Sequence, residues 1–145
     1  MNITPAEYQA MVHERAPRSP IWKNMLFAFL IGGSICMLGQ ILQNAFLSLG
    51  ISKTDTSTLV SVSLIFLSAL LTALNLYNSL ARYAGAGTLV PITGFANSVV
   101  SPAIDFRSEG FVTGMAAKMF VVAGPVIVFG TLASIFYGLL YYLFL

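Results

Sequence analysis

The stretch GAGTLVPITGFANSVVSPAIDFRSEGF, residues 85–111, decides how this chain is organised. It lies between long apolar segments, yet it begins with Gly-Ala-Gly and carries two prolines, Pro91 and Pro102. Glycine and proline both interrupt helices. Residues 93–101, between the prolines, are far too few for a membrane-crossing helix, which needs about 20 residues. We therefore predict a broken or re-entrant membrane element over residues 85–104.

The composition places the rest of the chain in a membrane. Of its 145 residues, 57% are hydrophobic and only 8% are charged, whereas roughly 25% are charged in soluble proteins. With a mean hydropathy of +0.85, few residues remain to cover a water-exposed surface. We predict an all-α integral membrane protein, a small helical bundle with a broken central segment. The net charge of +2 is small and dispersed, which argues against a nucleic-acid partner.

A polar leader, residues 1–23, precedes the predicted transmembrane domain, residues 24–145. Thr4 and Glu7 have the spacing of a capping box, so a short helix is predicted to begin there and to end before Pro17. This helix either rests on the membrane surface as an amphipathic segment or docks onto a partner. The leader is therefore predicted to be cytoplasmic or interfacial.

The apolar segments are long enough for several membrane spans. A continuous helix over residues 108–145 would measure about 55 Å, too long for a hydrocarbon core of about 30 Å. Gly124-Pro125 offers the natural break in that segment. We predict spans over residues 25–49, 58–80 and 125–143, with a shorter helix over residues 109–123.

Polar and small residues recur on one face of each of the first two predicted spans. The spacing of three or four residues places them along a single helical stripe. Such stripes either pack helices together through small residues and hydrogen bonds, or line a path for cargo. The first stripe contains Gly32, Cys36, Gln40 and Asn44; the second contains Ser68, Thr72, Asn75, Ser79 and Arg82.

The broken segment has a polar face of its own. On a helix, Gly94, Asn97, Ser98 and Ser101 would point the same way. Irregular backbone at membrane depth is tolerated only where protein buries it or where it lines a watery cavity. The segment is therefore either a re-entrant element near a conduction route or an interfacial loop with a short amphipathic turn.

Charged residues are few, and the densest group after the leader follows the broken segment. Asp105, Arg107 and Glu109 are either solvated at the interface, gating pairs, or a contact surface for another subunit. Gly110, Gly114 and Lys118 are four residues apart, which predicts a close-approach face with a cation next to it. The Lys118 side chain either reaches the interface or sits in a polar path.

Basic residues predict the orientation of the chain. Arg15, Arg18 and Lys23 precede the first span, against Lys53 in the next loop, so we predict a cytoplasmic N-terminus. Arg82 then returns to the cytoplasmic side. The C-terminus lies outside if the broken segment re-enters the same face, and inside if that segment crosses.

No arrangement of residues predicts catalysis. The only histidine, His13, lies in the leader, far in sequence from the only cysteine, Cys36, and metal-ligand spacing is absent. Asp105 and Glu109 are four apart, but Pro102 makes a regular helix there doubtful. No phosphate-binding glycine motif occurs. We predict that the chain is not an enzyme and holds neither a metal nor a cofactor.

Three stretches resemble the stage V sporulation protein AC/AE membrane family. They are FLIGGSICMLGQ (29–40), YAGAGTLVPITGFANSVVSPAIDF (83–106) and EGFVTGMAAKMFVVAGPVIVFG (109–130). The resemblance implies a multi-pass protein of the inner spore membrane of endospore-forming bacteria. It implies transport of dipicolinic acid, with calcium, into the forespore and out at germination, together with sister proteins AD and AE. It also implies a channel that responds to membrane tension.

A path for a small planar dianion needs neutral hydrogen-bond donors and some positive potential. The candidates for the cargo path or its gate are Gln40, Asn75, Arg82, Thr93, Gly94, Asn97, Ser98, Ser101 and Lys118. The candidates for subunit contacts are Gly32, Asp105, Arg107, Glu109, Gly110 and Gly114. Because so few segments enclose no obvious pore, we predict an oligomer or a hetero-complex in the lipid bilayer. The alternative is a non-conducting scaffold that assembles the true transporter.

Overall fold

The computed structural model describes residues 4–15 and 19–144, and within these ranges the secondary structure is helical, without strands. Three helical segments are long and apolar enough to cross a membrane, Ile21–Ser48, Lys53–Ala73 and Phe111–Phe144. The predicted all-α integral membrane fold is confirmed. The elements are α1 (Pro5–Arg15), α2 (Ile21–Ser48), α3 (Lys53–Ala73), α4 (Leu76–Ala84), α5 (Ala86–Leu89), α6 (Ile92–Asp105), the 3₁₀ turn η1 (Arg107–Glu109), the π-helical turn η2 (Phe111–Ala116) and α7 (Ala117–Phe144).

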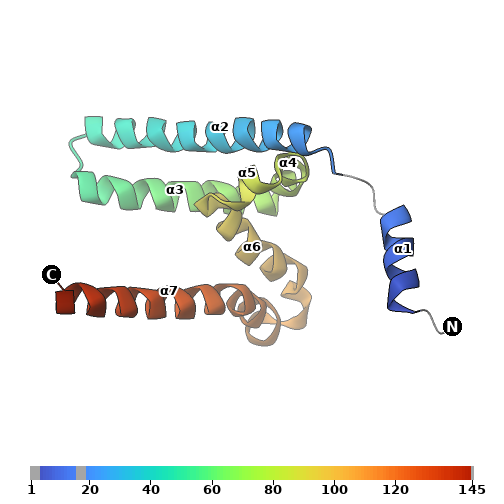
Figure 1. Ribbon diagram of the computed structural model, residues 1–145. Coiled ribbons are helices and arrows are strands. Elements are labelled where there is room, and N and C mark those ends of the chain that lie inside the picture. The colour runs from blue at the N-terminus through green and yellow to red at the C-terminus, as the bar shows by residue number, and fades with distance from the viewer. Residues whose placement is uncertain (1–3, 16–18, 145) are drawn as a thin grey trace.

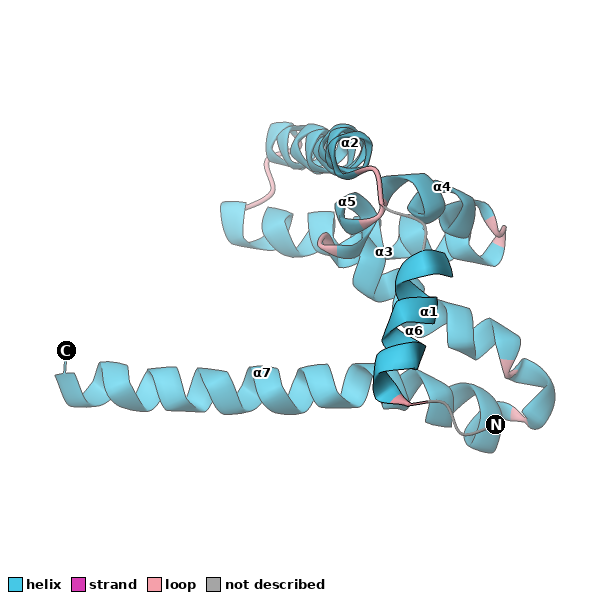
Figure 2. Cartoon of the chain, turned by 45° about the vertical axis from the view of Figure 1, so that its right-hand side comes forward, coloured by secondary structure: helices cyan, strands magenta, loops and turns pink. Residues whose placement is uncertain are grey.

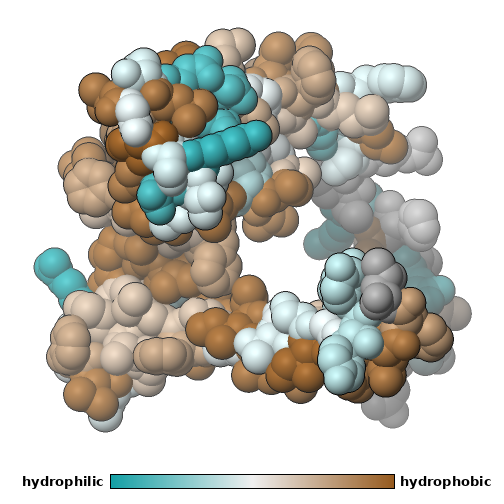
Figure 3. Space-filling model, turned by 90° about the vertical axis from the view of Figure 1, so that its left-hand side faces the viewer, coloured by the Kyte–Doolittle hydropathy of each residue, from teal (hydrophilic) through white to brown (hydrophobic). Residues whose placement is uncertain are grey.

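The helices form a hairpin, a broken element and a separate long helix (Figure 1). Helices α2 and α3 run antiparallel, and α4, α5 and α6 gather at the end where α2 begins and α3 ends. Helix α6 leads away from the hairpin to α7, which packs on α6 and η2 and extends alone towards the C-terminus (Figure 2). Figure 3 looks onto the end of the hairpin where α2 passes into α3; hydrophilic side chains gather in the upper part of this view, with hydrophobic side chains beside and below them.

Helix α1 and the hairpin follow their sequence signals closely. The Thr4 backbone N–H and hydroxyl both donate to the Glu7 carboxylate, at 2.9 and 2.8 Å, which forms the predicted capping box. Pro17 and Arg18 lie outside the described residues. Gly50, with φ of 82°, ends α2, and the Ser52 hydroxyl accepts the Asp55 backbone N–H at 3.2 Å to begin α3.

The second predicted span, residues 58–80, differs from the observed helices. Helix α3 begins at Lys53 and ends at Ala73, and α4 starts anew at Leu76. Asn75 adopts φ of 59°, a left-handed conformation that asparagine tolerates better than most residues, so the chain turns there. The predicted continuous stripe through Asn75 to Arg82 is therefore wrong.

Both prolines expected to end helices lie inside helices instead. Helix α6 continues through Pro102 to Asp105, and α7 continues through Pro125. Interior prolines are tolerated in membrane helices, where neighbouring groups satisfy the freed carbonyl. The predicted break at Gly124-Pro125 is wrong; the break falls at Gly110, whose φ of 104° suits glycine. Because the helix Phe111–Phe144 has 34 residues, about 50 Å, part of it must tilt or leave the hydrocarbon core.

The broken element folds back onto α3. The turn between α5 and α6 reaches back to Ser68, whose hydroxyl donates to the Thr93 carbonyl. Ser68 lies five residues before the end of α3, which corresponds to about 7.5 Å along the helix axis. Helix α6 then runs out again, so α7 starts near the end where α3 stops (Figure 1). In this arrangement the C-terminus lies at the opposite end of the molecule from the start of α2.

Candidate functional site

A group of buried polar side chains lies where α3, α4, α5 and α6 meet. We call it the polar cluster: Ser68, Thr72, Tyr77, Thr88, Thr93 and the half-buried Asn97. Polar groups at membrane depth are costly unless they are hydrogen-bonded, and those of the cluster have partners. The cluster therefore fixes how the broken element packs against α3 and α4.

Tyr77 is the centre of the cluster. Its hydroxyl lies 3.0 Å from the Thr88 carbonyl oxygen and 2.9 Å from the Thr93 hydroxyl. A phenol has one proton, so Tyr77 donates to the carbonyl and accepts from Thr93. Together with the 2.6 Å bond from Ser68 to the Thr93 carbonyl, these contacts tie both sides of the α5–α6 turn to the helices before it.

Asn97 is held by Thr72. The Thr72 hydroxyl lies 2.7 Å from the Ser68 carbonyl and 2.9 Å from the side-chain amide of Asn97. One hydroxyl proton serves one acceptor at a time, so the Thr72 hydroxyl donates either to the Ser68 carbonyl or to Asn97 Oδ1.

Two glycines let backbones approach where side chains would collide. A Cβ on Gly94 would lie 2.6 Å from the Leu89 carbonyl oxygen, so only glycine lets α6 fold back on α5. A Cβ on Gly87 would lie 2.8 Å from the Cα of Ala28. Gly32 faces the same contact, since a Cβ there would lie 3.2 Å from the Gly87 carbonyl. We call the contact of Ala28, Gly32 and Gly87 the glycine seam between α2 and α5.

A hollow of about 290 Å³ lies beside the polar cluster, and we call it the cluster pocket. The residues that line it are uncharged, and four of them have polar side chains that can donate or accept hydrogen bonds. The lining residues are Tyr77, Ala81, Gly85, Thr88, Leu89, Gly94, Asn97 and Ser98. The predicted path residues Gly94, Asn97 and Ser98 are thus brought to one place.

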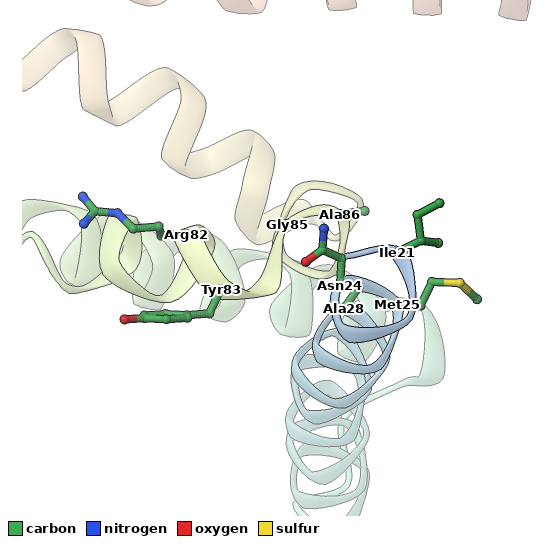
Figure 4. A pocket seen from close by; sticks show the side chains of 8 residues that line it. All are labelled: Ile21, Asn24, Met25, Ala28, Arg82, Tyr83, Gly85 and Ala86. Atoms are coloured by element: carbon green, nitrogen blue, oxygen red, sulfur yellow. The ribbon is translucent and has the colours of Figure 1, made fainter. Parts of the chain in front are cut away.

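Two further pockets share walls with the cluster pocket. One, of about 390 Å³, lies between the start of α2 and the end of α4 and includes Arg82 (Figure 4). It shares Gly85 with the cluster pocket. The other, of about 550 Å³, lies beside α6 and includes Val126 of α7; it shares Leu89, Gly94 and Ser98. The three hollows form a row along the broken element, which we call the pocket row.

Figure 4 shows how the Arg82 pocket is built. Asn24 and Met25 project from the first turns of α2, while Arg82 and Tyr83 come from the last turn of α4. The Arg82 guanidinium points away from the α2 side chains. A cation is therefore placed at the rim of this pocket, on the side away from α2.

The other predicted path residues lie apart from the cluster. Gln40 is exposed on α2, where its amide donates to the Asn44 side chain at 3.0 Å. Asn75 lies at the turn after α3 and accepts from Asn78 at 3.3 Å. The ammonium of Lys118 lies 4.2 Å from the centre of the Phe106 ring, a cation–π contact at the start of α7. Ser101 is half-buried on α6.

The predicted subunit-contact residues divide into two groups. Asp105, Arg107 and Glu109 are exposed around η1. Two of the glycines make contacts within the chain: Gly32 belongs to the glycine seam, and a Cβ on Gly114 would lie 2.8 Å from Glu109 Cβ. The close approach expected from the glycine spacing therefore closes η2 onto η1, and Gly110 provides the turn before it.

Sequence reasoning missed Tyr77 and Thr88 as members of the site. Tyr77 lies in α4, shortly after the apolar helix α3, and only 3% of the residue is exposed. A buried tyrosine requires a partner for its hydroxyl, so a lone tyrosine beside polar stripes is the signal that could have found it. Among the described residues, no group of three or more His, Cys, Asp or Glu side chains could hold a metal ion.

Comparison with known proteins places the chain in a family. The model of the SpoVAC/SpoVAEB sporulation membrane protein family matches residues 24–140. Stage V sporulation protein AC of Bacillus subtilis (strain 168) is 41% identical over 138 residues, which cover 94% of this chain and 92% of that protein. No solved structure matches. The chain belongs to the SpoVAC/SpoVAEB family of sporulation membrane proteins.

Proposed function

We propose that this protein is a subunit of a channel in the inner spore membrane that moves dipicolinic acid, with calcium, into the forespore and out at germination. The observation that carries the proposal is the pocket row. It follows the broken element from the Arg82 rim, past Asn97 and Ser98, to the side of α7. Family membership supports a role in sporulation, and the pocket row suggests where a small solute would pass.

The chemistry of the cluster pocket suits a neutral form of the cargo. Dipicolinate is a planar ring with two carboxylates, and moving a free dianion into an apolar environment is very costly. Its one-to-one calcium chelate carries no net charge. The cluster pocket is lined by neutral donors and acceptors, among them Tyr77, Asn97 and Ser98. Arg82, at the outer pocket, attracts the anion before or as it pairs with calcium.

The glycine seam is the element we propose to respond to membrane tension. There α5 rests on α2 through backbone atoms of Gly87 and Ala28 rather than through interlocking side chains. Lateral expansion of the bilayer would separate these surfaces with little side-chain rearrangement. Separation moves α5, which forms a wall of the pocket row, and so widens the route.

The protein would act in a complex with its sister proteins AD and AE, with its N-terminus in the cytoplasm. The basic residues Arg15, before α2, and Lys23, in the first turn of α2, support this orientation. The competing proposal is a non-conducting scaffold. It is favoured by α7, which packs on α6 and η2 and stands apart from the hairpin among the described residues (Figure 2).

Release of trapped calcium dipicolinate from liposomes separates the two proposals. The purified protein, the Asn97→Leu variant and a matched Asn78→Leu variant are reconstituted and swollen osmotically. Asn78 is exposed on α4 and lines none of the pockets described. A channel predicts tension-dependent release that Asn97→Leu reduces and Asn78→Leu preserves. A scaffold predicts no release from any of the three until sister proteins are added.

A further inference from the structure

One face of α2 carries polar groups that no other described part of the chain covers. Cys36, Gln40 and Asn44 are exposed, and Gly33 beside them has no neighbouring atom within 4 Å of where a Cβ would lie. The neighbouring side of α2 packs on α3 and on the glycine seam, whose Gly32 lies one turn before Cys36. We call the exposed stripe of Gly33, Cys36, Gln40 and Asn44 the amide face.

The amide face lies at membrane depth. Gln40 is about 28 Å from the start of α2 and about 12 Å from its end, at 1.5 Å per residue. Its exposed neighbours on the same side, Met37 at 65% and Ile41 at 58%, are apolar. Lipid tails offer no hydrogen bonds to the amides.

The hydrogen bond between the two amides leaves most of their capacity unused. Gln40 donates one N–H to the Asn44 oxygen. Among the described residues, the second N–H and the carbonyl oxygen of Gln40, and both N–H groups of Asn44, have no hydrogen-bond partner. The face therefore presents donors and acceptors together, so its partner must present both at the same depth.

We propose that a second copy of this chain packs on the amide face, with the two α2 helices side by side and parallel. A copy with the same membrane orientation brings Gln40 and Asn44 opposite Gln40 and Asn44, which satisfies both donors and acceptors. Gly33 and Cys36 are small enough for the helices to approach closely, as membrane helix pairs commonly do. This inference concerns assembly and does not depend on the cargo.

The single cysteine provides the first test. Cys36 is the only cysteine, so a disulfide dimer of the full-length protein in dilute liposomes reports contact at this face. A disulfide requires Cα atoms within about 7 Å. The matched control is Cys36→Ser with Leu38→Cys, because Leu38 is 41% exposed and lies about 200° around the helix from Cys36. We expect efficient cross-linking from Cys36 and background cross-linking from position 38.

Substitution of the amides provides the second test. Gln40→Leu and Gln40→Leu with Asn44→Leu should weaken dimerisation about 3- to 30-fold, as expected from hydrogen bonds between membrane helices. Met37→Leu, on the same side, should leave it unchanged. Energy transfer between labelled chains measures the dimer without relying on the thiol. Equal cross-linking from position 38, undiminished dimerisation of the leucine variants, or cross-linking of Cys36 only to a different protein would each overturn the proposal.

Discussion

Replacing Tyr77 with phenylalanine tests whether the polar cluster holds the broken element in place. The substitution removes one oxygen and keeps the ring, so packing is nearly unchanged. The Thr93 hydroxyl can rotate to another acceptor, but the Thr88 carbonyl cannot move and loses its 3.0 Å donor. A buried polar group left without a partner costs about 1–3 kcal/mol. We expect Tyr77→Phe to lower the free energy of unfolding by that amount.

Thermal unfolding of the reconstituted protein measures the loss. For a chain of 145 residues, each kcal/mol shifts Tm by about 2–5 °C, so Tyr77→Phe should lower Tm by roughly 2–15 °C. The control is Tyr83→Phe, which makes the same chemical change at a side chain that is 68% exposed, and should leave Tm unaltered. If the two variants unfold at the same temperature, the Tyr77 hydrogen bonds do not anchor the α5–α6 turn and the reasoning fails.

Three further substitutions probe other parts of the structure. Gly94→Ala should destabilise the protein by about 1–3 kcal/mol, because its Cβ would overlap the Leu89 backbone. Gly130→Ala should be neutral or slightly stabilising, since nothing lies within 4 Å of a Cβ at that position. If Gly94→Ala and Gly130→Ala change Tm equally, the close packing described at Gly94 is wrong. Ser52→Ala should cost about 1 kcal/mol of stability by removing the cap of α3, which denaturation measures. The hydrogen bond from the Thr4 backbone N–H lowers the pKa of Glu7 in the folded protein. The stabilising cap of α1 is therefore fully present above the ordinary carboxyl pKa, and it is lost as the pH falls through the lowered pKa of Glu7. Circular dichroism difference spectra should show this loss in the wild type and not in Glu7→Gln.

Periodic and capping signals predicted the helices well because they depend on near neighbours along the chain. The capping box at Thr4 and the long apolar segments reappear in α1, α2 and α3. The broken element was also predictable, since the chain does break at both Gly85 and Pro91. These signals are local, and their energetics change little with the fold.

The errors came from treating local breakers as decisive. Pro102 and Pro125 were predicted to end helices, but packing and the membrane environment carry both helices through. Asn75 ends α3 because it tolerates a left-handed conformation, which a stripe of polar residues does not reveal. The cluster around Tyr77 depends on contacts between residues far apart in sequence, so the sequence alone could not assemble it.

Accessibility of Ser98 during transport tests the pocket row most directly. In a Cys36→Ser background, Ser98→Cys places a thiol on a residue that lines both the cluster pocket and its neighbour. A charged, water-soluble thiol reagent should modify it under osmotic tension and block release of calcium dipicolinate. Val128→Cys, on the exposed side of α7, should stay unmodified in lipid. If Ser98→Cys resists modification while release proceeds, the solute passes elsewhere and the proposed route is wrong.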